Sequence, residues 1–390
     1  MTDTTRSGRV FLDAGGRAPL LPAAREAFLQ ALDQGWADPR RLHSEGRRAR
    51  LLLDGAREAI AAAVGARTEE VDLLPSHTLA LHAGVRAVAR GRRRAGRDVV
   101  VGAVERAAVL DTASFVVAQP WTPVTGRRVD VPVDRVGRVD LAPWAEAVAA
   151  PGVALAALQA ANGEVGTRQP VEQAHELARG AGVPLLVDAA GALGHVEVPG
   201  SWDLLAADPA DWGSVAGVGV LVTRTGVRRA PDWPEDEDRW APGGVSVPAA
   251  LAAAVSLQQV LMTQAADDAR RRALVGRIRE RVAAEVPDVE VVGDPEDRLP
   301  HVVTFSCLYV DGEALVGELD RAGFAVGSGS ACTASSLEPS HVLAAMGVLT
   351  HGNVRLTLPR DVAAADVERF LDVLPGAVAR VRAVLGVEGL

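Results

Sequence analysis

Hydrophobic and polar positions follow two periods along most of the chain. Residues 47–64 place Ala, Leu and Ile on one face and Arg and Glu on the other, which predicts an amphipathic helix. Short apolar runs at 98–101, 153–158 and 183–187 predict buried strands, and the last run ends in Asp188. Alternating helices and buried strands indicate an α/β fold with a parallel sheet covered by helices on both faces. The same hydrophobic patterns predict helices at 79–90 and 171–181 and a strand at 217–222.

The pattern changes after residue 228. Residues 228–244 are rich in Pro, Trp and acidic residues and are predicted to form a loop, and one or two long helices are expected at 249–286. The remaining chain predicts a smaller C-terminal α+β domain. We therefore expect a large domain at 13–250 and a small domain at 251–390 that also includes 1–12. Its expected strands are 301–305 and 353–358, and its expected helices are 313–322, 340–346 and 366–385.

All 41 basic residues are Arg, and the chain contains no Lys. Roughly 20 lysines would be expected at ordinary usage, and the coding bias of a GC-rich gene explains most of this depletion. The absence means that no Schiff base can form on a lysine side chain. The net charge of −9 argues against a nucleic-acid partner. The basic run at 90–97, between a predicted helix and a predicted strand, is interpreted as a solvated connector.

Several protein classes are excluded by the composition. No run of about 18 apolar residues lacks charges, so no membrane span is expected. The first residues have no basic segment followed by an apolar core, so no signal peptide is expected. Two cysteines, Cys307 and Cys332, cannot build a disulfide framework. We therefore expect a cytoplasmic protein.

The densest chemical feature is the segment 326–341, where small residues surround Cys332. A thiolate in such a loop could be exposed and mobile enough to attack a ligand held elsewhere. The alternative is a buried cysteine that packs as a small hydrophobic residue. The composition of the loop does not decide between these for Cys332, whereas Cys307 lies in the apolar run 302–307 and is expected to be buried.

Residues 327–343 resemble the active-cysteine loop of the cysteine desulfurases, which are pyridoxal-phosphate (PLP) enzymes of the class V aminotransferase fold (PLP fold type I). Further stretches similar to family motifs occur in the family order over most of the chain. The resemblance implies a mostly parallel, seven-stranded sheet in the large domain, dimerisation through that domain and PLP as the family cofactor. The matching stretches are 11–19, 38–47, 105–112, 162–166, 187–189 and 351–358.

Four residues match functional positions of the resembled family. Cys332 falls on the cysteine that forms a persulfide. Arg355 falls on the arginine that binds the substrate carboxylate, a bidentate task suited to a guanidinium group. Asp188 falls on the partner of the pyridine nitrogen, and Thr78 falls on a phosphate contact at a helix start, where anions are favoured.

Other positions depart from the family pattern. Asp211 stands where the family has its Schiff-base lysine, and Arg106 replaces the histidine that stacks on the pyridine ring. Ser76 and His77 replace glycines of the phosphate cradle. The remaining departures are Asp208 for a serine, Ala210 for a histidine, Gly191 for a glutamine, Gly163 for an asparagine and Gly244 for a threonine given to the neighbouring subunit.

These departures predict loss of the family chemistry, because desulfuration needs PLP bound as a Schiff base to act as an electron sink. Asp211 and Asp208 would also place negative charge near the phosphate dianion. Two like charges at about 6 Å repel by roughly 3 kcal/mol at an effective dielectric constant of about 20. Our hypothesis is that Arg106 pairs with Asp211 and that Trp212 fills the vacated space. PLP is then expected to bind at most non-covalently, in a vestigial pocket of Asp188, Thr78, Arg106 and His77.

Three functions remain open from the sequence. The chain could be a pseudoenzyme or sulfur-relay protein, in which Cys332 exchanges sulfur with a donor or acceptor protein and Arg355 holds an anionic ligand. It could instead be a scaffold or regulatory partner, as a homodimer or as a heterodimer with a desulfurase relative. Finally, the pocket could serve another enzymatic activity. No metal site is expected, because Asp188, Asp208, Asp211 and His77 show no ligand spacing.

Overall fold

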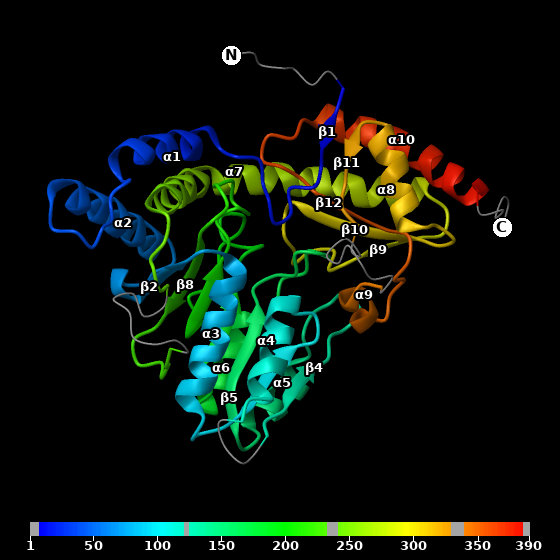
Figure 1. The fold of residues 1–390 in the computed structure, drawn as a ribbon. Coiled ribbons are helices and arrows are strands. Elements are labelled where there is room, and N and C mark those ends of the chain that lie inside the picture. Colours follow the sequence, from blue (N-terminus) through cyan, green and yellow to red (C-terminus); the bar gives the residue numbers. More distant parts are fainter. Residues whose placement is uncertain (1–7, 121–124, 232–240, 329–338, 385–390) are drawn as a thin grey trace.

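The computed structural model describes residues 8–120, 125–231, 241–328 and 339–384. A large domain built around a central sheet carries a smaller domain beside it, and one long helix, α7 (Val247–Glu285), extends along both (Figure 1). Cys332 lies outside the described residues, as do most residues of the acidic loop predicted at 228–244.

The central sheet of the large domain has seven strands in the order β2-β8-β7-β6-β5-β3-β4. Strand β8 is antiparallel to both of its neighbours, and the other pairs are parallel. This confirms the predicted α/β fold with a mostly parallel sheet. Strands β5, β6, β7 and β8 are buried along their whole length, which explains why their sequences are almost continuously apolar. The strands are β2 (Val71–Leu74), β3 (Asp98–Gly102), β4 (Arg128–Val131), β5 (Val153–Gln159), β6 (Leu185–Asp188), β7 (Leu204–Ala207) and β8 (Gly219–Thr223).

Helices cover both faces of this sheet. Helices α3 (His77–Arg92) and α4 (Ala107–Val117) pack on one face of the sheet, to which β3 contributes Val99 and Val101. Val100 of the same strand points to the other face, because side chains alternate along a strand. That second face is covered by α2 (Ser44–Ala63), α5 (Leu141–Ala149), α6 (Val171–Gly180) and the first half of α7. Helix α1 (Pro22–Gln34) packs against α7, and the 3-10 helix η1 (Thr68–Glu70) precedes β2.

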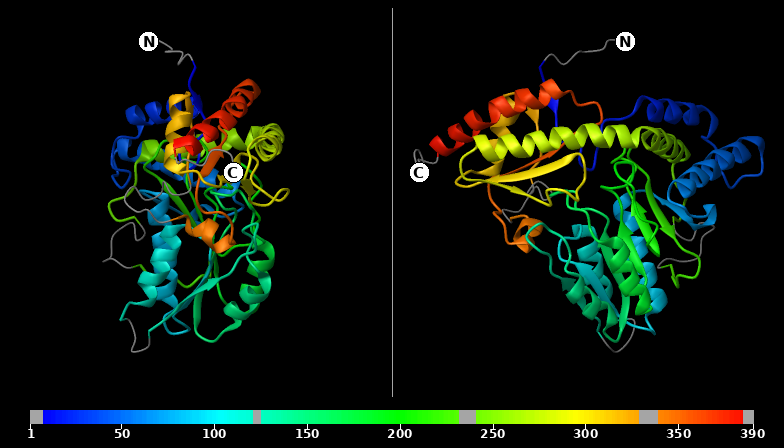
Figure 2. Two further views of the ribbon diagram at one scale, coloured as in Figure 1. Left: turned by 90° about the vertical axis from the view of Figure 1, so that its right-hand side faces the viewer. Right: turned by 180° about the vertical axis from the view of Figure 1, so that it is seen from behind.

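Helix α7 has 39 residues and belongs to two hydrophobic cores. Its residues up to Val260 pack in the core of the large domain, and its residues from Val275 onward pack in the core of the small domain. The expected domain boundary at 250/251 therefore falls near the start of a continuous helix. Among the described helices, α7 is the one long and apolar enough to cross a membrane, yet its buried side chains belong to these two cores. Figure 2 shows from behind how the helix lies along both domains.

The small domain combines a three-stranded antiparallel sheet, in the order β12-β10-β9, with helices α8 and α10. The N-terminal strand β1 pairs in parallel with β11 and joins this domain. Cys307 ends β10 and is buried as predicted, and burial raises the pKa of its thiol to about 11. The elements are β1 (Val10–Phe11), β9 (Val289–Val292), β10 (Val302–Cys307), α8 (Gly312–Arg321), β11 (Phe324–Ala325), α9 (His341–Met346), β12 (Asn353–Thr357) and α10 (Ala364–Val384).

Candidate functional site

The predicted site residues of the large domain meet at one edge of the central sheet. Asp188 is the last residue of strand β6, and His77 is the first residue of helix α3 after β2. Arg106 stands at the N-cap position of α4 after β3, without a capping hydrogen bond from its side chain. Asp211 follows β7 in the chain. The carboxyl ends of parallel strands share one edge of a sheet, and this edge is the usual ligand-binding position in α/β proteins.

Asp188 is held by a guanidinium group and an imidazole ring of the same chain. Arg106 donates from Nε to Oδ2 of Asp188 at 3.1 Å, and Nε2 of His77 lies 3.0 Å from Oδ1. The backbone N–H of Ala190 also donates to Oδ1, at 3.0 Å. Burial alone would raise the pKa of Asp188, but the charges of His77 and Arg106 outweigh it and hold the pKa well below its usual range. Asp188 is therefore a buried carboxylate whose two oxygens both have partners within the chain.

The structure contradicts the hypothesis that Arg106 pairs with Asp211. The guanidinium of Arg106 forms its ion pair with Asp188, and the charge of Asp211 acts on it only from a longer distance. Trp212 does not fill the space beside Arg106 either. Its indole N–H donates to the backbone oxygen of Ala253 at 3.2 Å and to Oγ of Ser256 at 3.1 Å, so the ring belongs to the core under α7.

Two further carboxyl groups at this edge have raised pKa values. Burial raises the pKa of Asp211 to about 7, and the charge of Asp208 adds to this effect, while Arg106 and His77 oppose it. Burial likewise raises the pKa of Glu105 to about 8. Oε1 of Glu105 accepts a hydrogen bond from the backbone N–H of Gln159 at 2.6 Å. In the sequence, Glu105 is distinguished only by its place in the family-like stretch 105–112.

The N-terminus of α3 is fixed by capping and by close packing. Oγ of Ser76 accepts a hydrogen bond from the backbone N–H of Leu79 at 3.2 Å, and Thr78 is exposed in the first turn. The backbone of Ser76 and His77 lies directly against Gly219 at the start of β8. A Cβ on Gly219 would lie 2.2 Å from the carbonyl carbon of Ser76 and 2.4 Å from the nitrogen of His77. Glycine at 219 therefore sets the position of His77 relative to Asp188.

Arg355 lies in β12 of the small domain, apart from the Asp188 cluster in the chain. Its backbone exchanges two hydrogen bonds with Gly327, and Nη2 donates to Oδ1 of Asp13 at 3.4 Å. Its Nε is buried and has no hydrogen-bond partner among the residues that the structure describes, so the guanidinium keeps a donor available there. Glu164 lies nearby, and burial raises its pKa although Ser340 and Arg355 oppose this.

The structure places Arg355 and the start of the segment that carries Cys332, but it does not describe Cys332 itself. Gly327, which pairs with Arg355, stands five positions before Cys332, but residues 329–338 lie outside the described residues. The proximity of Cys332 to Arg355 therefore stays a prediction.

A family model, "Aminotransferase class-V", matches residues 10–370. The chain belongs to the class V aminotransferase family. Among curated relatives, the chain is 34% identical over 384 residues to "Cysteine desulfurase" of Cereibacter sphaeroides, covering 96% of this chain and 97% of that protein. It is 35% identical over 385 residues to "IscS-like cysteine desulfurase" of Mycobacterium tuberculosis, covering 95% and 97%. These relatives confirm the resemblance to cysteine desulfurases.

Solved structures of other class V aminotransferases share the fold. A "NIFS-LIKE PROTEIN" superposes with a TM-score of 0.85 at 22% identity, covering 97% of this chain and 99% of the other. The apo structure of a cysteine desulfurase from Thermococcus onnurineus superposes with a TM-score of 0.81 at 21% identity, covering 95% and 94%. At such identities the likeness supports the fold alone.

The cofactor of the cysteine desulfurases in this family is PLP, and two features of this class V aminotransferase do not fit it. The sequence offers no lysine for a Schiff base. The carboxylate that the resemblance assigns to the pyridine nitrogen has Arg106 and His77 within 3.1 Å of its oxygens. A pyridinium ring would have to displace a charged guanidinium group from Asp188, which costs the ion pair already present. Among the described residues, no group of three or more His, Cys, Asp and Glu side chains could hold a metal ion.

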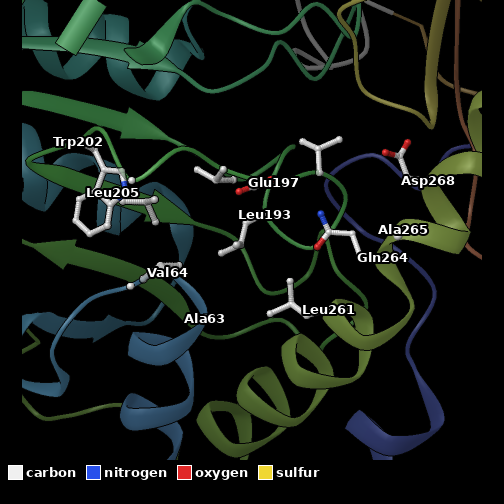
Figure 3. A pocket seen from close by; sticks show the side chains of 14 residues that line it. Ala63, Val64, Leu193, Glu197, Trp202, Leu205, Leu261, Gln264, Ala265 and Asp268 are labelled. Atoms are coloured by element: carbon white, nitrogen blue, oxygen red, sulfur yellow. The ribbon is translucent and has the colours of Figure 1, made fainter. Parts of the chain in front are cut away.

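A separate cavity of about 670 Å³ lies away from these residues (Figure 3). Its lining combines apolar side chains, among them Leu193, Leu205 and Leu261, with the polar side chains of Glu197, Gln264 and Asp268. None of the predicted site residues that the structure describes lines it.

Proposed function

We propose that this chain is a cysteine desulfurase-like protein that has lost lysine-dependent PLP catalysis and acts as a pseudoenzyme or sulfur-relay protein through Cys332. The observation that carries the proposal is the engagement of Asp188 by Arg106 and His77, in a chain without lysine. PLP would supply an electron sink when bound as a Schiff base, and this chain offers it neither the lysine nor a free aspartate. PLP could bind only non-covalently and in competition with Arg106.

The relay step needs no cofactor. The Cys332 thiolate attacks the outer sulfur of a persulfide donor, a new S–S bond forms at Cys332, and the donor leaves as a thiolate. Electrons balance, since one S–S bond replaces another. Arg355, which keeps a buried donor nitrogen free, would hold the carboxylate of an anionic donor or acceptor. This step uses the two family positions that are retained outside the altered cofactor site.

The proposed setting is a cytoplasmic dimer. The partner would be a second copy of this chain or a lysine-bearing desulfurase relative, and the sulfur acceptor would be a further protein. A scaffold or regulatory role without chemistry is the second candidate, favoured by the Arg106–Asp188 pair, which gives the altered site a stable structure of its own.

Mass spectrometry after incubation with an active desulfurase and cysteine tests the relay. We expect one added sulfur atom on Cys332, and no addition in Cys332→Ala. Cys307→Ala serves as the matched control and is expected to react as the wild type does, because its thiol is buried. Equal sulfur uptake by Cys332→Ala and the wild type would refute the relay. In that case, co-purification with a lysine-bearing relative would support the scaffold role.

Addition of PLP tests the loss of cofactor chemistry. We expect borohydride reduction to fix no PLP on any side chain, because no lysine is present and the terminal amine is the one primary amine left. A reduced PLP adduct that peptide mass spectrometry locates on a side chain of the protein would contradict the proposal.

A further inference from the structure

A group of cationic and imidazole side chains is buried where the two domains meet along α7. Arg271 of α7 is 0% exposed, and His195 and His301 are each 4% exposed. His195 follows β6 in the large domain, His301 precedes β10 in the small domain, and Arg360 follows β12. The side chain of Arg360 is 13% exposed. Both domains and the helix that joins them thus contribute to one buried cluster.

Two guanidinium groups of this cluster converge on the same imidazole nitrogen. Nη1 of Arg271 lies 3.1 Å from Nδ1 of His195, and Nη2 of Arg360 lies 3.5 Å from the same atom. A guanidinium can only donate, so Nδ1 accepts and the ring proton of neutral His195 is on Nε2. That Nε2–H donates to the backbone oxygen of Asp211 at 3.0 Å. The cluster is therefore hydrogen-bonded to the residue at the family's lysine position.

The positive charge of the cluster exceeds its negative charge. Asp267 pairs with Arg360 at 3.3 Å, and Asp268 pairs with Arg272 at 3.3 Å. Within the described ranges, Arg271 forms no ion pair, and its Nη2 is buried without a hydrogen-bond partner. Nδ1 of His301, whose ring stacks on His195 at 3.9 Å between centroids, and Nε of Arg360 are buried without partners too.

The ionisation of these groups leaves one unbalanced charge. Burial and the charge of Arg360 lower the pKa of Arg271 to about 9, so Arg271 remains cationic at pH 7. Burial and the neighbouring arginines hold the pKa of both His195 and His301 well below the usual value, so the histidines are neutral. A buried charge without a counter-ion is strongly unfavourable.

We propose that this domain junction binds a small monovalent anion of the chloride class beside Arg271, Arg360 and His301. One negative charge balances Arg271, because Asp267 already balances Arg360. Nη2 of Arg271 and Nε of Arg360 would donate to the anion, and His301 would donate as well in the tautomer that carries its proton on Nδ1. The 670 Å³ cavity is lined by Asp268 of the same helix but by none of these three side chains, so the proposed anion position is distinct from that cavity. The bound anion would link the two domains to α7.

Crystals grown in sodium bromide test the site directly on the wild-type protein. We expect an anomalous bromide peak within hydrogen-bonding distance of Nη2 of Arg271. Density of a water molecule at this position without an anomalous peak would overturn the proposal.

Thermal unfolding in sodium chloride and in sodium gluconate at equal ionic strength tests the effect on stability. With chloride well above its dissociation constant, we expect the wild-type Tm to be higher by about 3 °C than in gluconate. Arg271→Gln should lose this difference. Arg277→Gln, on the exposed side of the same helix where Arg277 pairs with Glu368, should keep it. Equal Tm values of the wild type in the two salts would contradict the proposal, whatever the variants do.

Discussion

At the scale of single residues, Asp188, which the sequence predicts to be the partner of the pyridine nitrogen, has partners from its own chain. Arg106 and His77, two of the departures from the family pattern, are the side chains that lie within 3.1 Å of its oxygens. Asp211, at the lysine position, has a pKa raised to about 7 by burial, so the site combines one strongly acidic and one weakly acidic carboxyl group. The three substitutions therefore act together in one ionic cluster.

Removing the carboxylate of Asp188 is expected to lower stability. Asp188→Asn leaves Arg106 without its counter-ion, and we expect a loss of about 2 kcal/mol in the free energy of unfolding at pH 7, measured by urea denaturation. This value lies below the range for fully buried pairs, because the Arg106 side chain is 42% exposed. Asp320→Asn, which removes the exposed pair with Arg9, is the control and should cost under about 1 kcal/mol. A loss for Asp188→Asn no larger than for this control would contradict the ionic cluster.

Asp211 is expected to lower stability at high pH. Its pKa is about 7 in the folded protein, against 3.8 for an unperturbed aspartate, so the folded state binds its proton more tightly. The free energy of unfolding should therefore fall as the pH rises from about 4 to 7, and Asp211→Asn should remove this part of the dependence. We expect the variant to gain about 4 kcal/mol relative to the wild type between pH 4 and pH 8. Urea denaturation across this range measures the gain, and a gain that does not grow with pH would contradict the raised pKa.

At the scale of elements, the contact between α3 and β8 positions the site. Helix α3 begins at His77, and the backbone of Ser76 just before it packs directly against Gly219 of β8. A residue with a Cβ at position 219 would not allow this contact. The same helix is capped by Ser76, which already uses the N–H of Leu79. The first turn of α3 is thus defined by packing and capping within the chain.

Gly219→Ala is expected to displace the first turn of α3. A Cβ at 2.2 Å from the carbonyl carbon of Ser76 forces the backbone apart, and overpacking of this kind costs about 3 kcal/mol. Gly180→Ala, at the end of α6, would meet no atom within 4 Å and should change stability by under about 1 kcal/mol. Urea denaturation of both variants measures the difference. Similar free energies of unfolding for the two variants would show that the structure accommodates a Cβ at position 219 without loss of stability.

At the scale of the whole molecule, α7 couples the two domains. The helix contributes Val260 and its preceding residues to one core and Val275, Ile278 and Val282 to the other. Between these parts lie Asp267 and Arg271 of the buried cationic cluster. A continuous helix shared by two cores makes their unfolding cooperative, because neither core can lose its part of the helix without affecting the other.

A proline in the middle of α7 is expected to separate the two unfolding transitions. Ala266→Pro places the ring at an exposed helix position, removes one backbone hydrogen bond and costs about 3 kcal/mol or more. We expect two calorimetric transitions in place of one. Ala266→Gly is the control, with a cost of about 1 kcal/mol and a single transition. A single transition for the proline variant would mean that contacts outside α7 are enough to couple the domains.

The sequence predicted the elements with clear periodicity and missed the others for identifiable reasons. The predicted helix at 47–64 is observed as α2, and the strand ending in Asp188 is observed as β6. Helix α4 was missed because it is apolar on most of its surface and shows no clear amphipathic period. Strand β7 was missed because four buried residues, Leu-Leu-Ala-Ala, do not distinguish a strand from a helix.

The candidate site was predicted as a set of residues but not as a set of pairs. The retained and altered family positions identified Asp188, Arg106, His77 and Asp211, and the structure brings these four to one edge of the sheet. The partner of Arg106 was predicted wrongly. Sequence position alone does not tell which of two nearby carboxylates lies within 3.1 Å of a guanidinium group.

The sequence by itself determined that no lysine Schiff base can form, because this depends only on whether the chain contains a lysine. It also determined the family, since the motifs occur in order along the chain. Only the tertiary structure decided that Arg106 pairs with Asp188 across 82 positions and that Arg271, His195 and Arg360 converge at the domain junction. The physical reason is that ion pairs and desolvation depend on distances of a few ångströms, which are set by how strands, helices and domains pack.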